Sequence, residues 1–247
     1  MISALRKAAA VLSSLVLIGS LSACSMSAEG EPKDLGGDPA FSTYYSQKID
    51  WTRCGDIWCA TVNVPIDWND PASDSMTIAL NQHMSPSAKR SLLVNPGGPG
   101  ASGVAFVRDN YDYIGTKSLR AKYNIVGFDP RGTGDSSPVK CLNAKQTDYL
   151  LYGDNGYEIG SKAELAANRK EIAKFVDACV QNSGPALGHI DTVSAARDMD
   201  VIRVALGQET LDYLGFSYGT FLGTTYAALY PERVGRFVLD GAIDPRV

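Results

Sequence analysis

The stretch GFSYG, from Gly215 to Gly219, has the residue types and spacing that present a reactive serine. An apolar run precedes Ser217, and small and apolar residues that end before Pro231 follow it. A strand, a sharp turn and a helix in this order predict a nucleophile elbow, in which flanking glycines avoid clashes with neighbouring backbone. The N-terminus of the following helix adds partial positive charge where an oxyanion would form. The predicted chemistry is acyl transfer through Ser217, which requires neither a cofactor nor a metal.

A second glycine-rich stretch, VNPGGPGASG from Val94 to Gly103, follows an earlier apolar run. Glycines allow backbone N–H groups to approach a substrate carbonyl closely. An oxyanion hole takes one donor from such a loop and one from the residue after the serine. We therefore assign the donors to Gly98 or Gly97 and to Tyr218. A phosphate-binding loop is the alternative, but the G-K-[ST] lysine and the G-x-G-x-x-G spacing are both absent.

A third motif, GFDPRGTGDSSP, runs from Gly127 to Pro138. Asp129, Arg131 and Asp135 in it could serve as catalytic groups. The alternative, which we favour, is a turn held by ion pairs and hydrogen bonds of Arg131.

Alternating apolar runs and helical patterns must position these motifs. The apolar runs cover residues 59–68, 75–83, 90–98, 122–130, 210–217 and 235–242. Residues 161–180 have helical spacing, with Leu165, Ile172, Phe175, Val176 and Cys179 on one face. Residues 191–207 predict a second helix, on which Asp198 and Asp200 are expected to face solvent. Short apolar runs between helices predict an α/β fold whose mostly parallel sheet has helices on both faces.

Six motifs in order resemble the actinobacterial tripeptidyl and prolyl aminopeptidase group of the α/β-hydrolases, secreted serine exopeptidases that are often lipoproteins. They are CATVNVPIDW, NPGGPGASG, VGFDPRGTGDSSPVKC, AARDMD, LGFSYGTFLGTTYA and RFVLDGAIDP. The resemblance extends from about Trp51 to the last residue. It implies an α/β-hydrolase fold, Ser217 as nucleophile, and removal of short peptides or single residues from peptide N-termini.

The catalytic acid and base of an α/β-hydrolase follow the serine along the chain. After Ser217 the sequence contains Glu232, Asp240 and Asp244 but no histidine. The resemblance implies about as much chain again, with a lid, the last strands, the acid and the base. We therefore expect this chain to be the N-terminal part of such a domain, without the lid and the C-terminal strands. Asp240 is a possible acid, because some α/β-hydrolases place theirs after the sixth strand.

The chain has two histidines, His83 and His189, and both precede Ser217. We interpret them as structural residues. The expected function is a serine hydrolase of the aminopeptidase type that is inactive alone, or active when a separate polypeptide supplies the missing half. The alternatives are a non-catalytic lipoprotein that binds peptides or a partner, and an esterase-type hydrolase.

The N-terminus has the pattern of an export signal over residues 1–23. Arg6 and Lys7 form a basic region, and an apolar stretch too short to span a bilayer follows them. Leu21 to Cys24 read LSAC, which resembles a bacterial lipobox with Cys24 as the acylated residue. We expect an exported protein anchored to the membrane by lipid; an ordinary cleaved signal and a secreted protein are the alternative.

Residues 24–50 are polar at first and are predicted to be a flexible tether, so that 51–247 form the hydrolase domain. Export favours disulfides. Besides Cys24, the chain has four cysteines, Cys54, Cys59, Cys141 and Cys179. Three pairings are possible, and proximity favours Cys54–Cys59 with Cys141–Cys179. The resemblance supports disulfides at these positions, and no metal-binding spacing accompanies them.

The composition is that of a globular protein, with 45% hydrophobic and 20% charged residues. The 23 basic and 27 acidic residues give a net charge of −4. This balance, without any run of lysine and arginine, excludes a nucleic-acid-binding surface of the usual kind.

Overall fold

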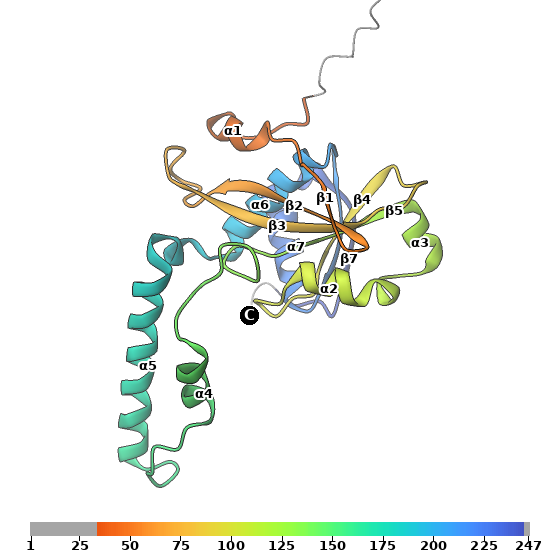
Figure 1. Ribbon diagram of the computed structural model, residues 1–247. Coiled ribbons are helices and arrows are strands. Elements are labelled where there is room, and N and C mark those ends of the chain that lie inside the picture. Colours follow the sequence, from red (N-terminus) through yellow and green to blue (C-terminus); the bar gives the residue numbers. More distant parts are fainter. Residues whose placement is uncertain (1–33, 245–247) are drawn as a thin grey trace, which may run out of the picture. The chain divides into compact units, whose positions relative to one another are not determined.

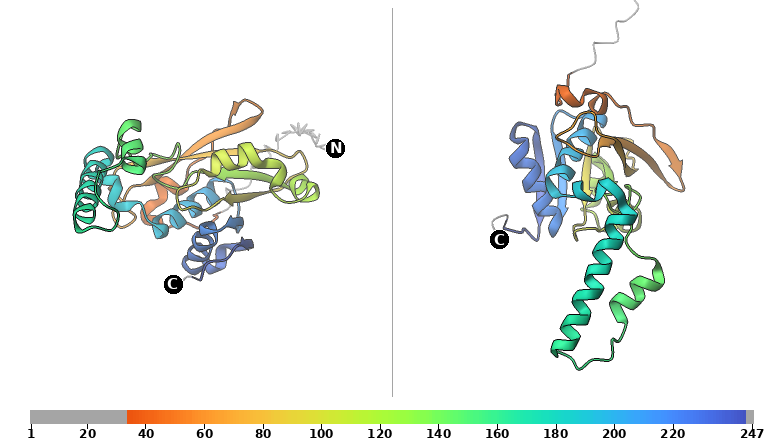
Figure 2. Two further views of the ribbon diagram at one scale, coloured as in Figure 1. Left: turned by 90° about the horizontal axis from the view of Figure 1, so that it is seen from below. Right: turned by 90° about the vertical axis from the view of Figure 1, so that its left-hand side faces the viewer.

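The computed structural model describes residues 34–244, which form a seven-stranded mixed sheet with helices on both faces (Figures 1 and 2). The predicted signal peptide and Cys24 lie outside these residues. The strands are β1 (Thr52–Cys54), β2 (Ile57–Pro65), β3 (Ser75–His83), β4 (Arg90–Asn95), β5 (Tyr123–Phe128), β6 (Leu211–Phe216) and β7 (Val234–Asp240). Their spatial order is β1-β2-β3-β5-β4-β6-β7.

The three strands that precede the motifs, together with β7, are parallel to one another. β5, β4, β6 and β7 pair in parallel, and β3, β2 and β1 extend the sheet in antiparallel fashion. Asn95 is in register with Gly215, and Phe216 with Asp240. Because parallel strands end at the same edge of a sheet, the three motifs and the end of β7 meet there. The predicted α/β fold is confirmed, and the antiparallel part comes from the first three strands.

Helices cover both faces of the sheet, whereas the helical segment 144–183 projects away from it (Figures 1 and 2). The α-helices are α1 (Ser42–Tyr45), α2 (Gly103–Asn110), α3 (Lys117–Lys122), α4 (Ala144–Tyr152), α5 (Lys162–Ser183), α6 (Thr192–Ala205) and α7 (Tyr218–Leu229). Short 3-10 turns are η1 (Pro39–Phe41), η2 (Tyr111–Tyr113), η3 (Gly184–His189) and η4 (Pro231–Arg233). Leu93 of β4 packs in a cluster with α6 and α7, whereas Leu92 and Val94 pack in a second cluster with α2. Both faces of the sheet are therefore buried, as a continuous apolar strand requires.

The tether predicted for residues 24–50 is wrong over its second half. η1 and α1 occupy part of it, and Phe41 is only 5% exposed, with its ring 4.9 Å from that of Trp68. Arg203 also donates a hydrogen bond to the carbonyl of Leu35, at 3.0 Å. The compact unit begins at Leu35. The aromatic residues of this segment are too few to show a period, although each one buries a large apolar area.

Both predicted disulfides, Cys54–Cys59 and Cys141–Cys179, are present. The second one connects the segment before α4 to α5. The helix predicted for 161–180 is confirmed, but its apolar residues do not share one buried face. Cys179 is buried, whereas Leu165, Ile172 and Val176 are about half exposed. In the part of the chain that the structure describes, no helix is long and apolar enough to span a membrane.

Candidate active site

Ser217 lies at the sharp turn between β6 and α7. Its backbone angles are φ 52° and ψ −123°, and its residue is exposed. A serine with positive φ is uncommon and strained, and such strain persists only where the surrounding structure imposes it. The Ser217 N–H donates to the carbonyl of Asp240 at 2.9 Å, which ties the turn to the end of β7. The turn therefore presents the hydroxyl to solvent at the N-terminus of a helix, the geometry of a nucleophile elbow.

Backbone contacts explain the two glycines that flank this serine. A Cβ atom on Gly215 would lie 2.5 Å from the Gly219 carbonyl oxygen. A Cβ atom on Gly219 would lie 2.7 Å from the carbonyl oxygen of Asn95, at the end of β4. Real Cβ atoms do not approach backbone this closely, so larger residues at either position would open the turn.

The glycine-rich loop after β4 lies directly against the elbow. A Cβ atom on Gly97 would lie 2.9 Å from the Tyr218 nitrogen. The N–H of Gly97 donates to Oδ1 of Asn95 at 2.9 Å, so it is already engaged within the loop. Tyr218 is the first residue of α7, where N–H groups have no partner within the helix. The glycine-rich loop and the elbow therefore lie against each other. Of the two glycines predicted as oxyanion donors, Gly97 already donates its N–H to Asn95, so Gly98 is the remaining candidate.

Asn95 is a site residue that the sequence analysis missed. Its side chain is 1% exposed, and it connects the glycine-rich loop to the elbow through the Gly97 hydrogen bond and the contact with Gly219. Within residues 34–244, its Nδ2 has no hydrogen-bond partner. A polar residue that ends the apolar run RSLLVN was the available signal, because buried polar groups in a strand need a specific reason.

Asp129 holds the glycine-rich loop to the turn after β5. Its side chain is 1% exposed, and Oδ1 accepts from the Ser102 hydroxyl at 2.6 Å and from the Val104 N–H at 3.0 Å. Oδ2 accepts from the Asp135 N–H at 2.9 Å. Ser102 is also the N-cap of α2, since its Oγ accepts from Ala105. The carboxylate of Asp129 thus holds the first residues of α2 in place, and with them the end of the glycine-rich loop.

Arg131 does hold its turn, but through a partner that the sequence analysis placed in solvent. It donates to both carboxylate oxygens of Asp198, at 2.6 and 2.7 Å, and both side chains are 1% exposed. The Trp68 indole N–H also donates to Asp198, at 3.0 Å. Burial raises the pKa of the Asp198 carboxyl, and the Arg131 guanidinium opposes that rise. The prediction that Asp198 faces solvent is wrong.

The same prediction is wrong for Asp200, which is fully buried. It accepts from Arg203 at 2.7 Å, from the Tyr226 hydroxyl at 3.1 Å and from Arg233. Burial, followed by the Asp200 charge, raises the pKa of Tyr226. These contacts join α6 to α7 and η4, so both aspartates of α6 serve packing rather than acid–base chemistry.

Neither histidine contacts Ser217 in the described part of the chain. His83 ends β3, which runs antiparallel to β5, so it lies at the sheet edge opposite the elbow. Its ring stacks on Tyr111 at 3.8 Å, and burial lowers its pKa. The Nδ1 atom of His189 lies 3.7 Å from Asp67, and its carbonyl accepts from Arg131. Both histidines have structural surroundings.

Asp240 lies beside the elbow through its backbone. Its carbonyl accepts from the Ser217 N–H, and its side chain is exposed. Ile243, shortly after it, donates to the Thr220 hydroxyl at 3.0 Å. The role of Asp240 as the catalytic acid stays a prediction. Among residues 34–244, no cluster of histidine, cysteine and carboxylate side chains could hold a metal ion.

Comparisons with known proteins agree with this geometry. Residues 90–247 match the family described as the alpha/beta hydrolase fold. The chain is 37% identical over 210 residues to a tripeptidyl aminopeptidase of Streptomyces lividans, covering 80% of this chain and 38% of that protein. It is 36% identical over 211 residues to the serine protease Hip1 of Mycobacterium bovis, covering 81% and 40%.

A carboxylesterase B of Mycobacterium tuberculosis is 34% identical over 252 residues, which cover 96% of this chain and 48% of that protein. The chain therefore spans less than half the length of these curated relatives. The family match includes the elbow, the glycine-rich loop and the parallel strands that carry them. This chain belongs to the α/β-hydrolase fold family.

Proposed function

We propose that the protein is a serine hydrolase of the aminopeptidase type, with Ser217 as the nucleophile. The observation that carries the proposal is the strained, exposed Ser217 at the start of α7, with the glycine-rich loop packed against it. The N–H groups of Gly98 and Tyr218 are the proposed oxyanion donors, because the N–H of Gly97 is bound to Asn95. The aminopeptidase activity of the Streptomyces relative supports short peptides with a free N-terminus as substrates.

The proposed triad needs a histidine that does not belong to residues 34–244 and an acid, for which Asp240 is one candidate. The order of α/β-hydrolase triads places both after the serine, and His83 and His189 are engaged elsewhere. A serine without its base is a weak nucleophile. We infer that a polypeptide following β7, in the same chain or in a separate one, supplies the histidine and completes the triad, and that residues 34–244 alone are inactive.

A fluorophosphonate probe tests both parts of this proposal. We expect little labelling of the 247-residue chain alone. Co-expression with the C-terminal part of the S. lividans aminopeptidase should produce labelling at Ser217, because that part would bring an acid and a histidine to the elbow. Ser217→Ala should abolish the labelling, whereas Ser46→Ala, at another exposed serine, should not change it.

Two results would contradict these expectations. Rapid Ser217-dependent labelling of the chain alone would show that a base exists among its own residues, and His189 and His83 would be replaced next. Labelling of the co-expressed pair that survives Ser217→Ala would show that another residue is the nucleophile.

An esterase is the second candidate, and the similarity to the mycobacterial carboxylesterase favours it. Substrate preference separates the two. An aminopeptidase should cleave a tripeptide amide with a free N-terminus and spare its acetylated form, because it must bind the terminal ammonium group. An esterase should hydrolyse p-nitrophenyl esters and neither amide. If the co-expressed pair is folded but neither reacts with the fluorophosphonate probe nor cleaves any of these substrates, the non-catalytic, peptide-binding lipoprotein is favoured.

We also propose export and lipid anchoring through Cys24, which the LSAC pattern supports. Cells that produce the protein and are fed a labelled fatty acid should incorporate the label into it. Cys24→Ser should abolish incorporation and release the protein into the soluble fraction, whereas the neighbouring Ser25→Ala should do neither. Label in the Cys24→Ser variant would contradict the assignment, and an unlabelled, soluble wild type would favour a secreted protein.

A further inference from the structure

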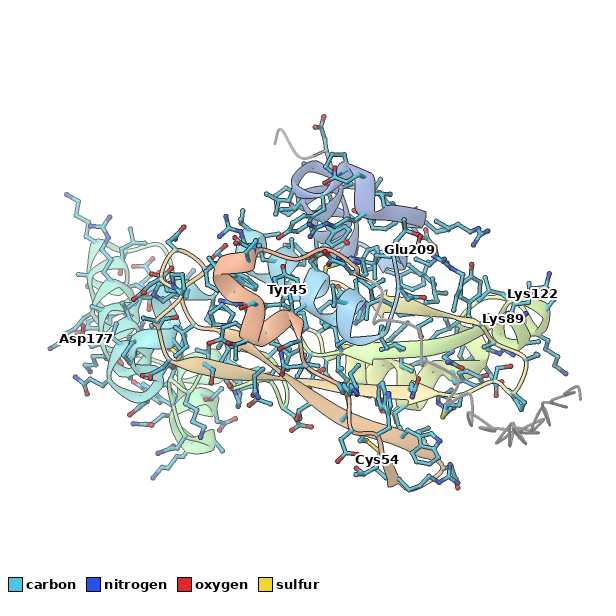
Figure 3. The ribbon with its side chains drawn as sticks, turned by 90° about the horizontal axis from the view of Figure 1, so that it is seen from above. Tyr45, Cys54, Lys89, Lys122, Asp177 and Glu209 are labelled. Atoms are coloured by element: carbon cyan, nitrogen blue, oxygen red, sulfur yellow. A yellow bond between two sulfur atoms is a disulfide. The ribbon has the colours of Figure 1, made fainter. Side chains whose placement is uncertain are left out.

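A pocket of about 440 Å³ with a basic lining opens at the sheet edge opposite the elbow. Its lining residues are Ser87, Lys89, Arg90, Lys122, Tyr123 and Arg236, which we call the basic pocket. Four of these six side chains are cationic, and none is a carboxylate. The chain as a whole has a net charge of −4, so this edge differs in sign from the average surface. Lys89 and Lys122 are both exposed and lie side by side (Figure 3).

A buried carboxylate holds the two arginines in place. Asp212, whose side chain is 1% exposed, accepts from Arg90 Nε at 2.6 Å and from the Arg236 backbone N–H at 2.8 Å. Arg236 Nη1 lies 3.2 Å from the Tyr123 hydroxyl, to which it donates. Although burial opposes it, hydrogen bonding to Arg90 holds the pKa of Asp212 below its usual value. The carboxylate of Asp212 is shared by the guanidinium groups of Arg90 and Arg236. The positive charges at the pocket therefore outnumber the negative ones.

Helix stabilisation does not explain the cluster. Lys122 ends α3, where a cation interacts favourably with the helix dipole. Lys89 precedes β4, however, and Arg236 belongs to β7. Three separate segments therefore bring cations to one place, which favours an external anion as their shared partner.

The described chain begins at this same edge. Arg203 donates from Nη1 both to Leu35, at 3.0 Å, and to the carbonyl of Glu209, at 3.2 Å. The next residue, Thr210, accepts from Arg90 of the basic pocket at 3.1 Å. A short chain of hydrogen bonds thus connects the start of the compact unit to the pocket.

We propose that the basic pocket docks onto the headgroups of anionic phospholipids. Phosphate oxygens accept hydrogen bonds from lysine and arginine, and anionic bilayers attract clustered cations within a Debye length of the surface. Residues 25–34 could span at most about 36 Å when fully extended, so an anchor at Cys24 would keep this edge close to a bilayer. Docking would turn the Ser217 edge away from the membrane, toward soluble substrates.

Vesicle binding tests the proposal without reference to catalysis. The predicted mature chain, residues 24–247 with Cys24→Ser to remove the acyl chain, is sedimented with vesicles of phosphatidylcholine, with or without phosphatidylglycerol. We expect binding only to the anionic vesicles, weakened by added salt.

The decisive variant is Lys89→Gln with Lys122→Gln. At about fivefold for each surface cation, binding to anionic vesicles should fall roughly 25-fold. The matched control is Lys162→Gln with Lys170→Gln, which removes the same charge from exposed positions on α5 and should leave binding nearly unchanged. Unchanged thermal unfolding midpoints in both variants would show that the exposed lysines do not support the fold.

Three outcomes would overturn the proposal. Equal binding to neutral and anionic vesicles would exclude a headgroup site. An equal loss of vesicle binding in the two double variants would show that binding depends on the net charge of the protein and not on the basic pocket. Calorimetric binding of glycerol 3-phosphate by a protein that does not bind the anionic vesicles would identify a site for a free phosphate ligand. Because Ser217 takes part in none of these measurements, they do not depend on the proposed hydrolase activity.

Discussion

Replacing Asp198 by alanine is expected to lower the free energy of unfolding by about 3–5 kcal/mol. Asp198 neutralises the guanidinium of Arg131, and both side chains are 1% exposed. Removal of the carboxylate leaves a buried cation without a counter-charge, and the indole N–H of Trp68 without its acceptor. Small domains are stable by only about 5–15 kcal/mol, so a loss of this size is a large part of the total. Chemical denaturation followed by circular dichroism measures it.

Two further variants separate charge from shape. Asp198→Asn keeps an acceptor for Trp68 and removes the charge, so its loss should lie between those of the wild type and Asp198→Ala. Arg131→Met combined with Asp198→Leu should recover only part of the stability. It leaves no buried ion without a counter-charge, but the indole N–H of Trp68 and the carbonyls that accept from Arg131 still lose their partners. A loss below about 1 kcal/mol for Asp198→Ala would mean that solvent reaches the pair and that the described burial is wrong.

The burial of Asp198 shows where local sequence patterns stop being informative. A polar residue on a predicted helix normally faces solvent, and nothing near Asp198 suggests otherwise. Its partners are Trp68, 130 residues away, and Arg131, 67 residues away. Only the tertiary fold brings them together, so a helical period of α6 could not reveal the pair.

Ser217 and its glycines were predictable because every requirement is local. The strand, the turn and the helix follow one another along the chain, and the turn needs small residues on both sides of Ser217. The parallel sheet then follows from short apolar runs between helices. Asn95 and Phe41 were not predicted, for different reasons. Asn95 ends a strand inside a motif that was interpreted only through its glycines. Phe41 belongs to a segment too short to show a hydrophobic period.

Replacing Asp129 by alanine is expected to displace the proposed oxyanion donors as well as to destabilise the fold. The change removes the acceptor for the Ser102 hydroxyl and for the N–H groups of Val104 and Asp135. Each buried donor left without a partner costs about 1–3 kcal/mol, so we expect a total loss of roughly 3–5 kcal/mol. Because α2 begins at Gly103, the loop that carries Gly98 loses its fixed end.

The effect on Ser217 should exceed what partial unfolding explains. Loss of one oxyanion donor slows acyl transfer by about 10²–10³, so fluorophosphonate labelling of the co-expressed pair should slow by roughly a hundredfold in Asp129→Ala. Asp129→Asn should slow it less, because Oδ1 can still accept from Ser102 and Val104 while the new amide opposes the Asp135 N–H. The asparagine variant thus weakens the turn while it preserves the contact with the loop.

Asp198→Ala is the matched control, since it loses a similar stability but leaves the bonds of the glycine-rich loop in place. If Asp129 positions the donors, labelling at low temperature, where both variants are folded, should be slow in Asp129→Ala and close to the wild-type rate in Asp198→Ala. Equal rates in the two variants would show that Asp129 acts through stability alone. The comparison also tests the assignment of Gly98, because a loop that supplied no donor could move without any change in the rate at Ser217.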